Sequence, residues 1–149
     1  MEEYLSSFRQ NENVYYLNKQ GRERVGATKI CKKNPQVSHY LMRNTMYIQL
    51  NCPSSWKNEI RIKTGKDGEL QAIADAKYEE NGVIHIVEID CTQKMIENRN
   101  KIKRYKEIVK YTGRDFFFHW VTTTHHRQKQ LQELSEGLQT RVNLIQDFI

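Results

Sequence analysis

The chain has 149 residues, of which 38% are hydrophobic and 28% charged, and its 24 Lys and Arg against 18 Asp and Glu give a formal net charge of +6 at pH 7. No run approaches the roughly 20 apolar residues of a membrane span, the start Met1-Glu2-Glu3 lacks the apolar region of a secretory signal, and Cys31, Cys52 and Cys91 have no CxxC spacing. These features predict a cytoplasmic protein without a membrane span and with reduced cysteines, and the positive charge favours an anionic partner such as nucleic acid.

The first part of the chain predicts a small substructure and a connection. Val14–Leu17 has the β-branched and aromatic content of a short strand, and Asn18–Gly21 opens a short helix. The stretch from Thr28 to Pro35 is basic and turn-like. We therefore expect two parts, residues 1–34 and residues 35–149.

The second part begins with a predicted helix and a meander. The helix covers residues 39–51 with Ser38 as its N-cap, and its apolar face is predicted to contain Leu41, Thr45, Ile48 and Cys52. Strands follow over residues 58–63, 73–78 and 83–91. Asn81-Gly82 between the last two is a strong hairpin signal, so the three strands are expected to form an antiparallel meander.

The remaining segments complete an α/β fold. Thr92 is expected to cap a helix over residues 93–111, and Gly113 to end it. Phe116–Val121 predicts a strand covered on both faces, and Thr124 caps a last helix over residues 125–138, with a helical or frayed tail to residue 149. The expected order is helix, three-stranded antiparallel meander, helix, strand and helix, in a mixed sheet flanked by helices.

Acidic residues collect at the end of the third meander strand. Alternation places Glu88 and Asp90 on one face, and hairpin register brings Asp75 of the preceding strand towards them. Three neighbouring carboxylates repel one another, and Mg²⁺ or Mn²⁺ bound by these three residues would relieve the repulsion. Such a site suits phosphodiester hydrolysis. The alternative is that the acids are solvated or paired with basic residues of the next helix.

The helix over residues 93–111 carries most of the positive charge. Seven basic residues against Glu97 and Glu107 give it a net charge of +5. A face of this kind predicts sequence-independent, salt-sensitive contacts with DNA phosphates, and a merely solvated helix face is the alternative. We assign the DNA contacts on this helix to Arg99, Lys101, Lys103, Arg104 and Lys106.

The order of strand, acid pair and capped helix in Glu88-Ile89-Asp90-Cys91-Thr92 resembles the PD-(D/E)XK nuclease fold, whose motif is an Asp followed by Glu-x-Lys on a hairpin. Asp75 and Glu88 match this motif, whereas Asp90 stands where it has lysine. In that superfamily the lysine helps to position or activate the attacking water. We expect Lys77, on the predicted face of Asp75, or Lys94, in the first turn of the helix, to supply the missing cation.

Several segments together resemble the replication-relaxation family: Tyr15–Gly21, the basic stretch through Lys33, His39 and Leu41, Ala74-Asp75-Ala76, Glu88–Thr92, Lys101–Tyr105 and Arg127. Family members are associated with plasmids and conjugative elements, and usually join a winged-helix DNA-binding half to a nuclease-like half. The resemblance implies that residues 1–34 are a remnant of the winged-helix wing and that residues 35–149 have a restriction-endonuclease-like core. It also implies that Arg127 contacts DNA phosphate, since a guanidinium can bind phosphate bidentately.

Two functions follow from these observations. The first is a DNA-binding protein of a plasmid or other mobile element that acts as a Mg²⁺-dependent deoxyribonuclease in replication or DNA relaxation. The second is a non-catalytic accessory module that keeps the fold and binds DNA or a replication or conjugation protein. Asp90 in place of the motif lysine favours the second function.

Overall fold

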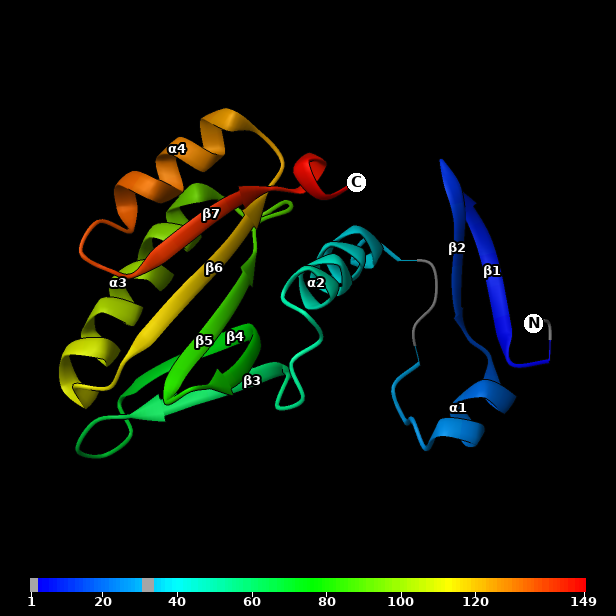
Figure 1. Ribbon diagram of the computed structural model, residues 1–149, viewed down its shortest axis with the longest axis horizontal. Coiled ribbons are helices and arrows are strands. Elements are labelled where there is room, and N and C mark those ends of the chain that lie inside the picture. Colours follow the sequence, from blue (N-terminus) through cyan, green and yellow to red (C-terminus); the bar gives the residue numbers. More distant parts are fainter. Residues whose placement is uncertain (1–2, 31–33) are drawn as a thin grey trace. The chain divides into compact units, whose positions relative to one another are not determined.

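The computed structural model describes residues 3–30 and 34–149 (Figure 1). The chain divides into two compact units, residues 1–37 and 38–149, three residues later than the boundary that we predicted. The predicted basic connection and the predicted reduced state of Cys31 fall partly on Cys31, Lys32 and Lys33, which lie outside the described residues. Across the described residues, no helix has both the length and the apolar character needed to cross a membrane.

The smaller unit contains a hairpin and one helix. Strands β1 (Leu5–Gln10) and β2 (Glu12–Leu17) pair antiparallel, and α1 (Lys19–Val25) follows. Asn18 caps this helix, because its side-chain oxygen accepts a hydrogen bond from the backbone N–H of Gly21. The strand and the short helix were expected from sequence, whereas β1 was not.

The larger unit is a five-stranded mixed sheet flanked by helices. Its elements are α2 (Val37–Gln49), β3 (Lys57–Thr64), β4 (Leu70–Glu80), β5 (Val83–Ile89), α3 (Met95–Thr112), β6 (Phe116–Thr122), α4 (His125–Leu134), β7 (Thr140–Leu144) and the 3-10 turn η1 (Ile145–Phe148). The strand order is β3-β4-β5-β6-β7. The first three strands pair antiparallel, and β5, β6 and β7 pair parallel. The predicted antiparallel meander and the predicted mixed sheet are confirmed.

The hairpin between β4 and β5 follows its sequence signal. Asn81 and Gly82 both have positive φ, 51° and 77°, which is the requirement of the turn that Asn-Gly pairs favour. Gly113 likewise ends α3 in the left-handed conformation, with φ of 62°, and its N–H donates to the carbonyl oxygen of Val109. Both predictions are confirmed.

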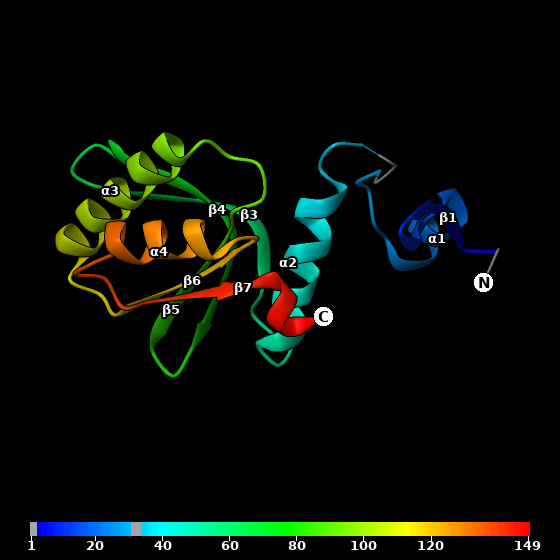
Figure 2. The same ribbon diagram turned by 90° about the horizontal axis from the view of Figure 1, so that it is seen from above.

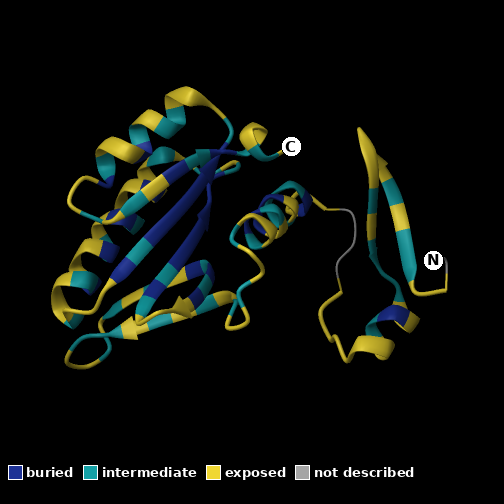
Figure 3. Ribbon diagram, viewed as in Figure 1, coloured by how far each residue is buried: buried dark blue, intermediate teal, exposed yellow. Residues whose placement is uncertain are grey.

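Two apolar cores lie on opposite faces of the sheet. The helices α3 and α4 lie together on one face, and α2 lies on the other side of the strands (Figures 1 and 2). Ile86, Tyr105 and Trp120 belong to the core beneath α3 and α4, whereas Val87 and Met46 belong to the core beneath α2. Strands β5 and β6 are therefore buried on both faces along most of their length (Figure 3).

The predicted inward face of α2 is wrong. Met42 and Met46 face the core, with 6% and 1% of their surface exposed, whereas Leu41 and Ile48 are 41% and 64% exposed. The two methionines lie four residues apart and form a competing apolar stripe on the helix. Packing against the sheet decides which of the two stripes is buried, and the sequence of the helix alone does not specify that packing.

The start of α3 and the end of α4 differ from expectation. The helix α3 begins at Met95 with Lys94 at its N-cap position and no side-chain cap, so Thr92 does not cap it. The helix α4 ends at Leu134, and the predicted helical tail instead contains β7. Pairing with β6 makes this segment a strand, and that pairing is long-range and leaves little local signal.

Strand β4 reverses its side-chain alternation at Asp75. Ala74 packs in the core beneath α3, but Ala76, two residues later, packs in the core beneath α2. The β3–β4 ladder passes from the pair Asn58–Ala76 directly to the pair Ile60–Ala74, and Glu59, between them on β3, has a positive φ of 52°. This irregularity brings Asp75 to the point where β4 and β5 part, since their last paired residues are Ala76 and Val87.

Candidate functional site

Asp75 bridges the gap between β4 and β5. One of its carboxylate oxygens accepts the backbone N–H of Ile89 at 2.7 Å, and the other lies 3.1 Å from His39 Nε2 of α2. Burial raises the pKa of Asp75, but the hydrogen bond from His39 and the charge of Lys101 outweigh burial, so the pKa lies below its ordinary value. Asp75 is therefore an ionised carboxylate at neutral pH.

Glu88 is almost completely buried, with 2% of its surface exposed. Its carboxylate accepts a hydrogen bond from Lys101 Nζ at 2.7 Å and another from the Tyr105 hydroxyl. Burial and the nearby charge of Asp75 raise the pKa of Glu88 to about 8, against the opposing effect of Lys101. The two acids thus differ, because Asp75 favours the ionised form and Glu88 the protonated form.

We name Asp75, Glu88, Lys101 and Tyr105 the carboxylate–lysine cluster. Lys101 and Tyr105 lie four residues apart on α3, so they share one helix face above Glu88. The Lys101 side chain remains 28% exposed, which gives the cluster a polar edge in solvent. Lys101, which we predicted to contact DNA, forms an ion pair with Glu88 in the structure.

Asp90 belongs to a different, structural network. It is fully buried and accepts two hydrogen bonds from Arg127, at 2.7 and 2.6 Å. It also accepts from Asn98 at 2.8 Å and from Thr122 at 2.7 Å. Burial raises the pKa of Asp90, but the bonds from Arg127 and the other donors outweigh burial and lower it. Asp90 has no capacity left for a metal ion, and Arg127 is engaged away from phosphate, so the metal role of Asp90 and the phosphate role of Arg127 do not fit.

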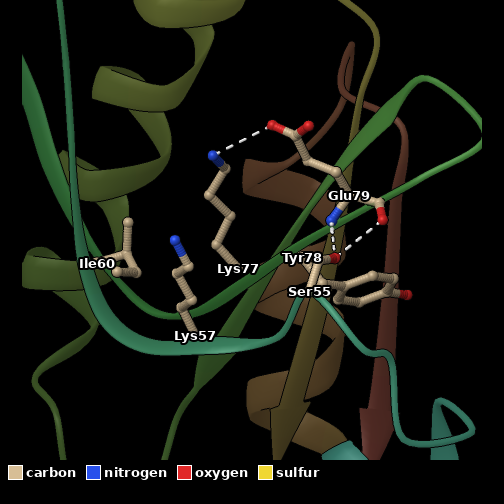
Figure 4. A pocket seen from close by; sticks show the side chains of 6 residues that line it. All are labelled: Ser55, Lys57, Ile60, Lys77, Tyr78 and Glu79. Atoms are coloured by element: carbon tan, nitrogen blue, oxygen red, sulfur yellow. Dashed lines mark hydrogen bonds and ion pairs between the residues drawn. The ribbon is translucent and has the colours of Figure 1, made fainter.

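The other two predicted cations also have different surroundings. Lys77 Nζ lies 3.3 Å from Glu79, and with Lys57 it lines a pocket formed by Ser55, Ile60, Tyr78 and Glu79 (Figure 4). The reversal of β4 at Asp75 removes the shared face on which the prediction for Lys77 depended. Lys94 is exposed at the N-cap of α3. The charges that act on Asp75 are those of Lys101 and His39.

The helix α3 presents a basic stripe to solvent, formed by Arg99, Lys103, Lys106 and Lys110 at spacings of four, three and four residues. All four side chains are exposed. Arg104, another predicted DNA contact, lies 3.7 Å from Glu107 and donates to the backbone carbonyl of Glu69 at 3.4 Å. The stripe faces away from the buried residues of the helix, so three of the five predicted contacts remain exposed for an anionic partner.

The carboxylate–lysine cluster has the donors of a small hard-cation site. Within residues 3–30 and 34–149, no three His, Cys, Asp or Glu side chains are grouped so that they could hold a metal ion. The two carboxylates of Asp75 and Glu88 nevertheless both interact with the Lys101 ammonium, and such oxygens are the ligands that Mg²⁺ and Mn²⁺ prefer. Asp75 and Glu88 are thus the two acids of this cluster that could hold a divalent cation, whereas we predicted three.

This mixed α/β domain has two strands that part at a pair of acids, with a lysine on the crossover helix beside them. The sequence model of the replication-relaxation family matches residues 2–136. The chain belongs to the replication-relaxation family, as its motifs suggested.

Among solved structures, the chain is similar to the small subunit of the heterodimeric restriction endonuclease R.BspD6I, with a TM-score of 0.47 and 12% sequence identity. The similarity covers 72% of this chain and 63% of that subunit, so this chain spans less than two thirds of that subunit's length. No curated protein matches the sequence.

Proposed function

We propose that the carboxylate–lysine cluster hydrolyses phosphodiester bonds in DNA with a divalent metal ion held by Asp75 and Glu88. The observation that carries this proposal is the contact of 2.7 Å between Lys101 Nζ and Glu88, together with the effect of the same ammonium on Asp75. Two acids and a lysine thus lie together, although the lysine comes from α3 and Asp90 occupies the position at which the nuclease motif has lysine. Membership in the replication-relaxation family supports DNA as the substrate.

The residues of the cluster have separate roles in this proposal. A bound Mg²⁺ or Mn²⁺ would activate water and stabilise negative charge on the phosphate. Lys101 holds a positive charge and N–H donors beside the acids, and it can donate to a phosphate oxygen or to water. Tyr105 orients Glu88 and His39 orients Asp75 through their hydrogen bonds, so both are positioning residues.

We propose DNA as the main partner of the chain. The basic stripe of α3 supplies contacts to the DNA backbone that do not depend on sequence. A plasmid or other mobile element as the setting, and a replication or conjugation protein as a further partner, are supported by the family alone.

Cleavage of supercoiled plasmid tests the catalytic proposal. We expect nicking by the wild-type chain with Mg²⁺ or Mn²⁺, and a loss of at least about 100-fold in Asp75→Asn and Glu88→Gln, because each variant removes a carboxyl ligand of the proposed metal ion. Asp147→Asn is the matched control, since Asp147 is exposed in η1. Unchanged cleavage in both cluster variants would remove the proposed site.

A non-catalytic DNA-binding module is the second candidate. The deep burial of Glu88 and its pKa of about 8 favour this function, because a protonated carboxyl binds Mg²⁺ poorly. In the plasmid assay, binding of DNA without metal-dependent cleavage would support the module over the enzyme.

The basic stripe predicts strongly salt-dependent binding. The double variant Lys103→Ala/Lys106→Ala is expected to weaken DNA binding and to reduce the slope of log affinity against log salt by about two, since each phosphate contact contributes about one. Gel-shift titrations from about 50 to 300 mM salt measure this slope. Lys66→Ala/Lys129→Ala, at two exposed lysines outside α3, is the control. Binding that persists without loss across this range would contradict the phosphate contacts.

A further inference from the structure

Helix α2 carries a buried arginine that the proposed site does not use. Arg43 is 7% exposed, and its Nε and Nη1 atoms are buried without a hydrogen-bond partner. Buried guanidinium donors are normally satisfied by carboxylates, backbone carbonyls or water, and an unsatisfied one is costly. Arg43 therefore carries a positive charge and hydrogen-bond donors that its surroundings do not fully satisfy.

Arg43 faces a carboxylate that does not satisfy it. Nη1 lies 3.5 Å from Glu59 Oε1, which makes an ion pair without a hydrogen bond. The Glu59 side chain is 49% exposed, and its positive φ of 52° is unusual for a residue other than glycine. The guanidinium also lies 5.0 Å from the centre of the Tyr40 ring, which restricts its orientation. Glu59 thus brings an acidic oxygen from the solvent side to a fixed guanidinium.

Arg43 lies on the α2 side of the sheet, near Asp75 of the carboxylate–lysine cluster. His39, which contacts Asp75, precedes Arg43 by four residues on α2, so the two side chains lie on the same helix face. The β3–β4 ladder pairs Asn58 with Ala76 and Ile60 with Ala74, so Glu59 and Asp75 lie opposite each other between these two pairs. The Arg43 guanidinium is thus close to Asp75, because His39 on α2 contacts Asp75 and Glu59 on β3 contacts Arg43.

We propose that Arg43 binds a backbone phosphate of DNA next to the carboxylate–lysine cluster, and that the Glu59 carboxylate occupies this position until the phosphate displaces it. The choice of DNA as the anion rests on the proposed function. The guanidinium itself would accept any phosphate dianion or diester, because it recognises charge and oxygen lone pairs. DNA and free phosphate are therefore the two sources that the experiment has to separate.

Removing the competing carboxylate is the sharpest test. Binding of the full chain to a fluorescein-labelled DNA duplex is measured by anisotropy in EDTA at about 100 mM salt. Glu59→Gln is expected to bind DNA about tenfold more tightly than Glu133→Gln, the size of one charge-assisted hydrogen bond gained. Glu133 is an exposed glutamate on α4, so its variant corrects for the general effect of one negative charge. Equal affinities of the two variants would overturn the proposal.

Replacing Arg43 is expected to change the DNA affinity in the opposite direction. Arg43→Gln is expected to weaken DNA binding about tenfold and to lower the salt slope by about one relative to Arg141→Gln, a control at an exposed arginine of β7. An unchanged slope would overturn the proposal. Because Arg43 is buried, circular dichroism checks that Arg43→Gln is folded. If it is not, Glu59→Gln decides the question with the arginine still in place.

Inorganic phosphate distinguishes the source of the anion. With DNA as the ligand, millimolar phosphate leaves the difference between Glu59→Gln and Glu133→Gln intact at matched ionic strength. If phosphate instead abolishes the difference, the site belongs to the free ion and the DNA proposal is wrong. All these measurements are made without a divalent metal. A chain that shows the Arg43 effects but never cleaves plasmid would therefore disprove the nuclease proposal and keep the phosphate site.

Discussion

Replacing Arg127 with Met is expected to lower the free energy of unfolding by about 3–5 kcal/mol, the cost of leaving one member of a buried ion pair without its partner. Asp90 is fully buried, and Arg127 supplies two of its hydrogen bonds and its neutralising charge. Asn98 and Thr122 would remain, but both are neutral donors. Urea denaturation followed by circular dichroism measures the loss.

Two variants make this result specific. Arg99→Met replaces an exposed arginine on α3 and is expected to change the stability by less than about 0.5 kcal/mol. Asp90→Asn combined with Arg127→Met removes both charges, and we expect it to be more stable than Arg127→Met alone. If Arg127→Met and Arg99→Met are equally stable, the network around Asp90 does not support the fold in the way described.

The stability of the metal-free chain is expected to fall as the pH rises towards 8, because of Glu88. Its pKa is about 8 in the folded chain, against 4.5 for an ordinary glutamate, so the folded chain holds this proton more tightly than the unfolded one. The stabilisation is fully present below about pH 4.5 and is lost as the pH rises through about 8, with a total on the order of a few kcal/mol.

Glu88→Gln isolates this effect. Glutamine cannot ionise, so the variant is expected to lose most of the pH dependence between about pH 5 and 8 and to gain stability over the wild type at the upper end. Denaturation midpoints measured in EDTA across this range give the two slopes. Glu133→Gln, at an exposed position, should keep the wild-type slope. A wild-type slope in Glu88→Gln would show that Glu88 ionises in the folded chain as easily as in the unfolded one.

Local patterns predicted the elements that depend on local chemistry. Short segments of sequence were enough to predict the Asn81-Gly82 turn, the alternation along β5 and the left-handed conformation of Gly113. Together these elements led to the prediction of a mixed sheet. Strand β7 was missed because it pairs with β6, and the whole of α4 separates these two strands in the sequence. The face of α2 was wrong because two apolar stripes fit the helix and packing chose between them.

The candidate site was predicted in part for the same reason. Asp75 and Glu88 lie on neighbouring hairpin strands, so their pairing could be expected from register. Lys101 is thirteen residues from Glu88, and Arg127 is 37 residues from Asp90. These contacts depend on where the helices cross the sheet, and no spacing in the sequence specifies that crossing. The available signal for Lys101 was its position on α3, directly before the inward-facing residue Ile102.

The carboxylate of Asp75 accepts the N–H of Ile89 at the point where the two strands have stopped pairing through their backbones. One side chain therefore serves as a catalytic ligand in our proposal and as the last rung of the β4–β5 ladder. We expect a lineage that lost cleavage to keep this aspartate, because replacing it would remove the link between the two strands at this point. The acid alone is thus a poor marker of enzymatic activity in related sequences, and Lys101, which no backbone group requires, is a better one.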